Sequence, residues 1–154
     1  MDFMISSIRN NTAIIKSVLL NHEDKLEAFD MIEKLISIAN KARREGIIAI
    51  ENMTFDNQFL KKGISQITQG TCPELVESIL KRYIIAGDYD GLELLKRLII
   101  LDGVLLIQQR ENPRRIYDVL IAWLGEDFEP PEQIFESEEE VMKKIKKMMG
   151  ETNE

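Results

Sequence analysis

The sequence predicts an all-α protein: a compact bundle of about six helices, followed by a C-terminal amphipathic helix on an acidic, proline-containing linker. Three observations predict this class. Apolar residues recur at three- and four-residue steps through most of the chain. The breaks between these stretches carry helix start and stop signals, chiefly glycine, proline and asparagine. No stretch shows a convincing two-residue alternation of apolar and polar side chains, as a half-buried strand would.

The first fifty residues are expected to form two helices. An apolar stripe runs through residues 3–19, and Asn21 can end that helix. A second stripe begins at Leu26 and continues to Met53. Gly46 lies inside it, at a cost of about 1 kcal/mol relative to alanine. We expect this glycine to allow the close approach of another helix.

Two further helices are expected before a glycine-rich turn. The third helix covers residues 55–67 and stops at Gly70. The fourth follows at once, with Thr71 as its cap and Pro73 in its first turn. A turn over residues 87–91, with two glycines and two aspartates, separates it from the next helix.

The second half of the chain begins with its most apolar helix. Residues 92–109 carry apolar side chains around most of the helix circumference, and Gly103 within them is expected to be a packing glycine. Asn112 then caps a helix with Pro113 at its first position, and Gly125 ends that helix.

Three parts of the chain follow from these elements. Residues 1–125 are expected to form the helical domain. Residues 126–136 are acidic, contain two adjacent prolines and are expected to be a linker. Residues 137–150 are expected to form the final helix, with Ser137 as its cap, lysines in its last turn and Gly150 as its stop.

Composition excludes several classes of function. The 154 residues are 44% hydrophobic and 31% charged, so a core can form in one domain. The net charge of −7 argues against nucleic acid, which needs a basic surface, and against an anionic membrane surface. A single cysteine, Cys72, favours a reducing compartment. The most apolar stretch contains Asp102 and is about half the ~20 residues of a membrane span, so we expect a cytoplasmic protein with no membrane-spanning segment.

Residues for catalysis or metal binding are sparse. His22 is the single histidine, and its neighbours indicate a surface or capping role at a helix junction. Cys72 lies at a helix N-terminus but has no basic partner nearby in the sequence. Metal-ligand clusters and a glycine-rich phosphate loop are also missing from the sequence pattern. We therefore expect no enzyme activity, no catalytic residues, no metal and no cofactor.

The stretch ARREGIIAIE, residues 42–51, is the strongest candidate for a partner-binding surface. It supplies Arg43, Arg44, Glu45 and Glu51. On a continuous helix, Arg43 and Glu51 would lie about 12 Å apart on either side of one broad face. Opposite charges at that spacing suit docking against the charges of another protein. The simpler alternative is a solvated helix face.

Three stretches, taken in order, resemble a known family. They are ANKARREGIIAIE (residues 39–51), FLKKGISQITQGTCPELVESIL (residues 59–80) and LDGVLLIQQRENPRRIYDVLIAWL (residues 101–124). Together they cover about half of the chain and resemble the cytoplasmic parts of MotA. MotA is the stator subunit of the bacterial flagellar motor and belongs to the MotA/TolQ/ExbB proton-channel family.

The sequence also differs from MotA at the places of the membrane helices. In MotA, one pair of membrane helices precedes the first stretch and another separates the second stretch from the third. Here we expect the first pair to be absent and the second to be replaced by the turn at residues 86–91. The resemblance then implies a MotA cytoplasmic domain without its channel, unable to conduct protons by itself.

In the family, residues at the places of Arg43 and Glu51 face the rotor protein FliG and pair with charges on its C-terminal domain. The resemblance therefore implies FliG as the partner. A second hypothesis is an assembly module that binds full-length stator subunits or itself, motivated by the apolar coverage of residues 92–107. A third is an engineered stator protein without its channel, in which the turn at residues 87–91 is artificial.

Overall fold

The computed structural model describes residues 20–131 and 138–150. Within these residues the structure is all-α, as predicted, and contains no strand. The α-helices are α2 (His22–Glu45), α3 (Gln58–Thr68), α4 (Pro73–Gly87), α5 (Gly91–Gln108), α6 (Pro113–Ile121) and α7 (Glu138–Met148). Two short 3-10 helices, η1 (Ile47–Ile50) and η2 (Ala122–Leu124), follow α2 and α6. The helix expected over residues 3–19 and the cap expected at Ser137 lie outside the described residues.

Local capping explains where the helices begin. Asn21 was expected to end an earlier helix, but it caps the start of α2: its side chain accepts a 2.8 Å hydrogen bond from the backbone N–H of Asp24. Thr71 was expected to cap α4, and that prediction is wrong. Cys72 is the N-cap residue, and the Thr71 hydroxyl instead donates to Gln66 Oε1 at 2.9 Å. The prediction for Asn112 is confirmed, because its side chain accepts from the N–H of Arg114 at 2.9 Å.

The two glycines expected to allow close packing differ in the structure. At Gly103 the prediction is confirmed: an added Cβ would lie 2.8 Å from Leu35 Cδ1, across the α2–α5 contact. At Gly46 the prediction is wrong, because an added Cβ would meet nothing within 4 Å. Gly46 has φ +94° and ψ 165°, and α2 ends there. The helix expected to reach Met53 is thus cut short by a backbone turn that favours glycine.

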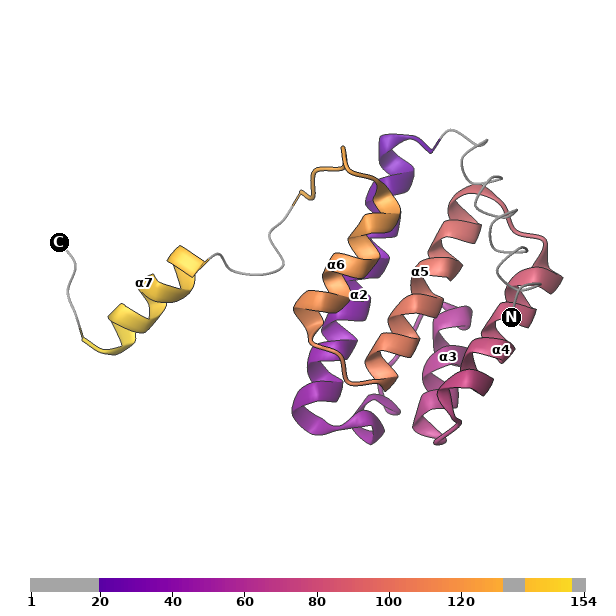
Figure 1. Ribbon diagram of the computed structural model, residues 1–154, viewed down its shortest axis with the longest axis horizontal. Coiled ribbons are helices and arrows are strands. Elements are labelled where there is room, and N and C mark those ends of the chain that lie inside the picture. The colour runs from indigo at the N-terminus through magenta and orange to yellow at the C-terminus, as the bar shows by residue number, and fades with distance from the viewer. Residues whose placement is uncertain (1–19, 132–137, 151–154) are drawn as a thin grey trace.

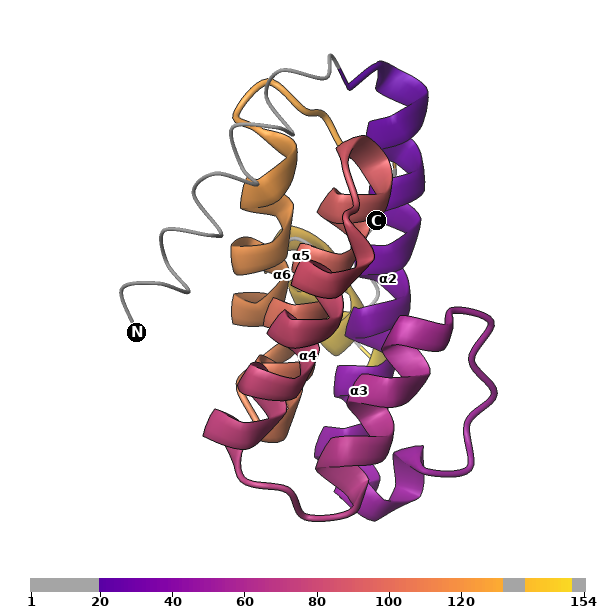
Figure 2. The ribbon, with the colours of Figure 1, turned by 90° about the vertical axis from the view of Figure 1, so that its right-hand side faces the viewer.

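Helix α5 is the centre of the bundle. It packs against α2, α3, α4 and α6 (Figures 1 and 2). Ten of its 18 residues are buried, which accounts for apolar side chains on most of its circumference. Close approach of α3 is possible at Gly63, where an added Cβ would lie 2.9 Å from Val104 Cγ2. Helix α7 lies apart from this bundle (Figure 1).

The bundle has two ends, each formed by different connections between the helices (Figures 1 and 2). At the lower end lie the end of α2 with η1, the α3–α4 connection and the α5–α6 connection. At the upper end lie the start of α2, the α4–α5 turn and the segment after η2. Among the described helices, none combines the length and the apolar character needed to cross a bilayer.

Candidate functional site

The four residues expected to bind a partner lie together at the lower end of the bundle. Arg43, Arg44 and Glu45 form the last turn of α2, and Glu51 follows η1. All four are exposed. Glu45 forms a 3.9 Å ion pair with Lys41. Within the part of the chain that the structure describes, Arg43, Arg44 and Glu51 form no ion pair and are available to a partner.

Their geometry differs from the continuous helix face assumed from the sequence. Because Gly46 ends α2, Arg43 and Glu51 belong to two different helical segments. The segment that carries Glu51 is a single 3-10 turn, in which the Glu51 N–H donates to the Ile48 carbonyl oxygen at 3.1 Å. The expected spacing of 12 Å on one face therefore does not apply, although the four side chains share one end of the bundle.

Sequence reasoning missed one residue at this end. Ile48 is 74% exposed, whereas Ile50, two residues later, is fully buried. The sequence pattern placed Ile47 and Ile50 on the apolar stripe that ends at Met53 and assigned no role to Ile48. A 3-10 turn has three residues per turn, so Ile47 and Ile50 share a side and Ile48 does not. Gly46 is the signal from which this change of geometry follows.

The second and third MotA-like stretches reach the same end. Gln108 Nε2, at the end of α5, donates a 2.6 Å hydrogen bond to the carbonyl oxygen of Thr71, in the α3–α4 connection. This bond ties together two stretches that are 37 residues apart. The following α5–α6 connection holds Arg110 at φ +56°, and Arg115 pairs with Glu111 at 3.6 Å. All three stretches therefore contribute to one charged end.

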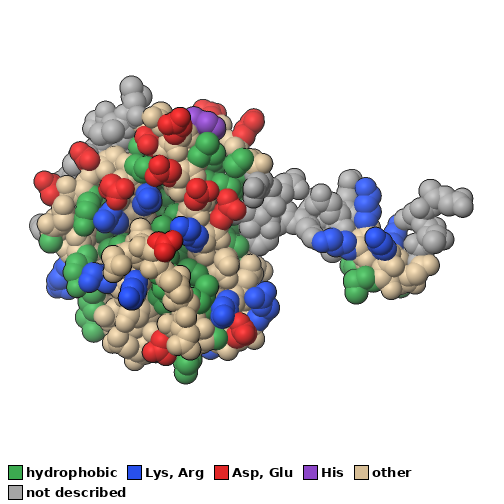
Figure 3. All heavy atoms as spheres, turned by 180° about the vertical axis from the view of Figure 1, so that it is seen from behind, with side chains coloured by type: hydrophobic (Ala, Val, Ile, Leu, Met, Phe, Trp, Pro, Cys, Tyr) green, Lys and Arg blue, Asp and Glu red, His purple; other side chains and the backbone are tan. Residues whose placement is uncertain are grey.

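Charge is distributed unevenly along α2. Its first turn is acidic, with Glu23 and Asp24, and its last turn is basic, with Arg43 and Arg44. This order complements the helix dipole, whose positive pole is at the N-terminus. On the face drawn in Figure 3, acidic side chains gather near the single histidine at the upper end, and lysines and arginines are mixed with them lower down.

Asp102 and Trp123 form a partly buried polar pair away from this end. The Trp123 indole N–H donates to Asp102 Oδ2 at 2.7 Å. Burial raises the pKa of the Asp102 carboxyl above its ordinary value, and the hydrogen bond from Trp123 opposes this in part. The pair links α5 to η2 and lies inside the third MotA-like stretch.

We predict that Asp102 makes stability depend on pH. Because its pKa is higher in the folded chain than in the unfolded chain, the folded protein binds the proton more tightly. Stability should therefore fall as pH rises from about 4 through the folded pKa. The Asp102→Asn variant keeps an acceptor for Trp123 and should remove this decrease. Urea unfolding followed by Trp123 fluorescence measures it. The exposed Asp118→Asn variant is the control and should keep the wild-type slope.

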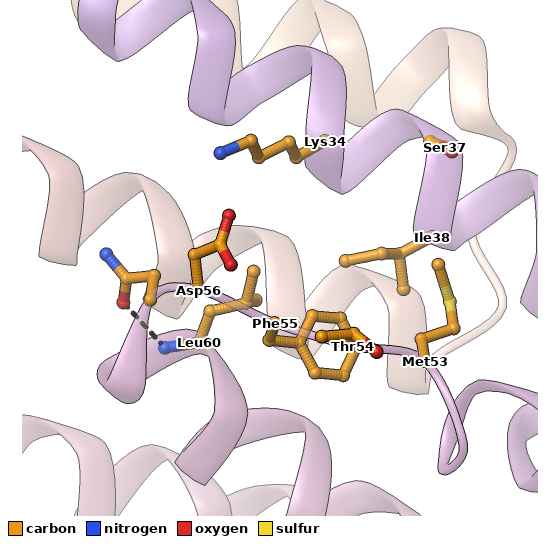
Figure 4. A pocket seen from close by; sticks show the side chains of 9 residues that line it. Lys34, Ser37, Ile38, Met53, Thr54, Phe55, Asp56 and Leu60 are labelled. Atoms are coloured by element: carbon orange, nitrogen blue, oxygen red, sulfur yellow. Dashed lines mark hydrogen bonds between the residues drawn. The ribbon is translucent and has the colours of Figure 1, made fainter.

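Surface hollows among the described residues include one beside α2 and one beside α4. The first, about 180 Å³, lies between α2 and the segment before α3 (Figure 4). Lys34 and Asp56 stand on opposite sides of it, over Ile38, Met53 and Phe55. The second, about 310 Å³, lies between α3 and α4 and is lined mainly by polar side chains. Ligand pockets typically measure about 300–1,000 Å³ and are mostly apolar, so neither hollow identifies a small-molecule site.

The groups with shifted pKa values lie elsewhere. Glu93 has its pKa lowered, first by its hydrogen bond from Arg97. Burial raises the pKa of Tyr117. Neither residue, nor Asp102, lines either of the two hollows described above. No group of three or more histidine, cysteine, aspartate or glutamate side chains able to hold a metal occurs in residues 20–131 and 138–150.

Fold and site together define a helical bundle with a charged end assembled from three separate stretches of sequence. Comparison with known proteins adds one similarity. The chain is 31% identical over 88 residues to the chemotaxis protein PomA of Vibrio alginolyticus, a match that covers 57% of this chain and 34% of PomA. The chain thus spans about a third of the length of this curated relative. No family model matches the chain. No solved structure matches it either.

Proposed function

We propose that this chain is a MotA-related, non-enzymatic cytoplasmic protein that associates with the flagellar motor by binding the rotor protein FliG. The binding surface is the end of the bundle that carries Arg43, Arg44, Glu45 and Glu51. The observation that supports this most is that Arg43, Arg44 and Glu51 are exposed and form no ion pair within the described residues. The similarity to PomA supports the association with motility. We assign no ion transport to this chain.

The arrangement of the two ends supports the same proposal. In MotA, membrane helices lie before the first stretch and between the second and third stretches. The corresponding places here are the start of α2 and the turn between Gly87 and Gly91. Both lie at the upper end of the bundle, opposite the charged residues (Figures 1 and 2). Arg43 and Glu51 therefore lie at the end of the bundle opposite the places that carry membrane helices in MotA.

The charges are expected to set orientation and association rate more than affinity. An exposed ion pair contributes about 0–1 kcal/mol, because water and salt screen it. Complementary charges across an interface raise the association rate and suppress wrong partners. Two or three such pairs would give weak, salt-dependent binding on their own.

Charge reversal tests the proposal. We expect the Arg43→Glu/Glu51→Arg variant to bind the FliG C-terminal domain at least about tenfold more weakly than wild type at low salt, because each attractive pair becomes repulsive. Titration calorimetry measures the affinity. The loss should shrink at high salt, where exposed charges are screened.

A matched control changes no net charge and lies elsewhere. Arg82→Glu/Glu126→Arg exchanges two exposed charges, on α4 and after η2, and should leave binding unchanged. Absence of binding by the wild type, or equal losses in both double variants, would contradict the proposal.

The structure gives a different explanation for the observation that motivated the hypothesis of an assembly module. That hypothesis rested on apolar side chains around most of the helix over residues 92–107. In the structure these side chains are covered by α2, α3, α4 and α6 of the same chain, so they require no second molecule. Light scattering tests whether the chain self-associates or binds full-length stator subunits. A monomer that does not bind full-length stators would contradict both possibilities.

A further inference from the structure

Ile48 is an apolar residue that does not belong to the core of the bundle. Among the large hydrophobic side chains of residues 20–131 it is the most exposed, at 74%, and the next, Leu75, is 49% exposed. Single exposed hydrophobic residues are common and need no explanation by themselves. Ile48 differs in its position, since it stands at the end of the bundle where Arg43, Arg44 and Glu51 form no ion pair within the described residues.

The backbone holds Ile48 in this position. Gly46, at φ +94°, turns the chain out of α2 and starts the 3-10 turn. Because residues three apart in a 3-10 helix are eclipsed, Ile47 and Ile50 lie on one side of the turn. Ile50 is buried and Ile47 packs against the core. By the same rule Ile48 and Glu51 share the outer side. Ile47 and Ile50 thus hold the turn against the core, and Ile48 lies on its outer side beside the Glu51 carboxylate.

We infer that Ile48 is the apolar anchor of the protein-binding surface at this end. Its partner is a protein with an apolar pocket that is bordered by carboxylates facing Arg43 and Arg44 and by a cation facing Glu51. This inference rests on the proposed function, because it assigns the same surface, and it adds the group that supplies affinity. Protein interfaces combine a desolvated apolar centre with a polar rim that excludes water. Ile48 with its charged neighbours has this composition.

Charge favours a different protein over a second copy of this chain. Of the four candidate residues, Glu45 is paired with Lys41. The other three form no ion pair within the described residues and sum to a charge of +1, from Arg43, Arg44 and Glu51. Two copies meeting through this same surface would bring like net charges together. A partner pocket with a net acidic border is complementary to it.

The test compares Ile48→Ser with Ile85→Ser in binding to the FliG C-terminal domain by titration calorimetry. Ile85 is also exposed, but it lies on α4 toward the upper end. We expect Ile48→Ser to weaken binding about tenfold or more, since an isoleucine is no longer buried in the complex. Ile85→Ser should change it by less than about twofold. Both variants should unfold at the wild-type urea concentration, because neither side chain belongs to the core.

The salt dependence of binding distinguishes the contribution of Ile48 from that of the charged residues. The ratio between wild type and Ile48→Ser should be the same at low and high salt, whereas the effect of Arg43→Glu should diminish as salt rises. If the wild type binds FliG and Ile48→Ser binds equally well, the anchor is overturned and the proposed function stands. If the wild type does not bind FliG, both are overturned. Sedimentation velocity showing a wild-type dimer that Ile48→Ser dissociates would identify a second copy as the occupant and overturn the assigned partner.

Discussion

Replacing Leu35 with alanine is expected to lower the free energy of unfolding by about 2–5 kcal/mol, as truncation of a fully buried leucine does. Leu35 has no exposed surface. It lies across the α2–α5 contact, where its Cδ1 would be 2.8 Å from a Cβ on Gly103. Urea unfolding of purified protein measures the change. Lys34→Ala, on the exposed side of the same helix, is the control and should be nearly neutral.

The double variant sharpens this prediction. Gly103→Ala alone should destabilise by about 1–3 kcal/mol, because the added methyl group overpacks against the fully buried Leu35 side chain. In Leu35→Ala/Gly103→Ala the same methyl group enters the cavity left by the leucine. The double variant should therefore be more stable than the sum of the two single changes predicts. Simple additivity would show that the contact between Leu35 and Gly103 is not the cause.

Replacing Gly46 with alanine is expected to reduce both stability and binding. A φ of +94° with ψ of 165° lies in a region that is essentially restricted to glycine, at a cost of about 1–3 kcal/mol for other residues. The variant must either bear this strain or change the turn. A changed turn would displace Ile48 and Glu51 relative to Arg43 and Arg44, so we also expect weaker binding to FliG.

Gly70→Ala is the matched control for that variant. Gly70 has φ +81°, and an added Cβ would meet nothing within 4 Å, as at Gly46. It lies in the α3–α4 connection at the same end of the bundle. We expect it to lose stability by a similar amount in urea unfolding and to keep wild-type affinity in calorimetry. Equal losses of affinity in the two variants would contradict a specific role for the turn at Gly46.

The helical class was predictable because its signals are local. Apolar periodicity and capping residues act over one or two turns, and the helix starts at Pro73 and Pro113 were both expected from such signals. Boundaries were less predictable where two local signals compete. Thr71 and Cys72 both lie just before Pro73; in the structure Cys72 is the N-cap residue, and the Thr71 hydroxyl donates to Gln66.

The candidate site was predictable in composition and less so in shape. The charged residues Arg43, Arg44, Glu45 and Glu51 stood out because they cluster in the sequence, and all are exposed in the structure. Ile48 was missed because the predicted apolar stripe joins Ile47 and Ile50, and a single isoleucine off that stripe gives no local signal of a function. In the structure Ile48 lies off the side shared by Ile47 and Ile50, on a 3-10 turn.

By itself, the sequence determined the all-α class, most helix starts and the residues that carry charge at the candidate site, because each depends on neighbours a few positions away. Only the tertiary structure decided which glycine packs and which one turns the chain. Gly46 and Gly103 each interrupt an apolar helical pattern, but only Gly103 lies under a side chain of another helix. The meeting of three separate stretches at one end was likewise decided by packing around α5, since contacts between distant segments are invisible to local periodicity.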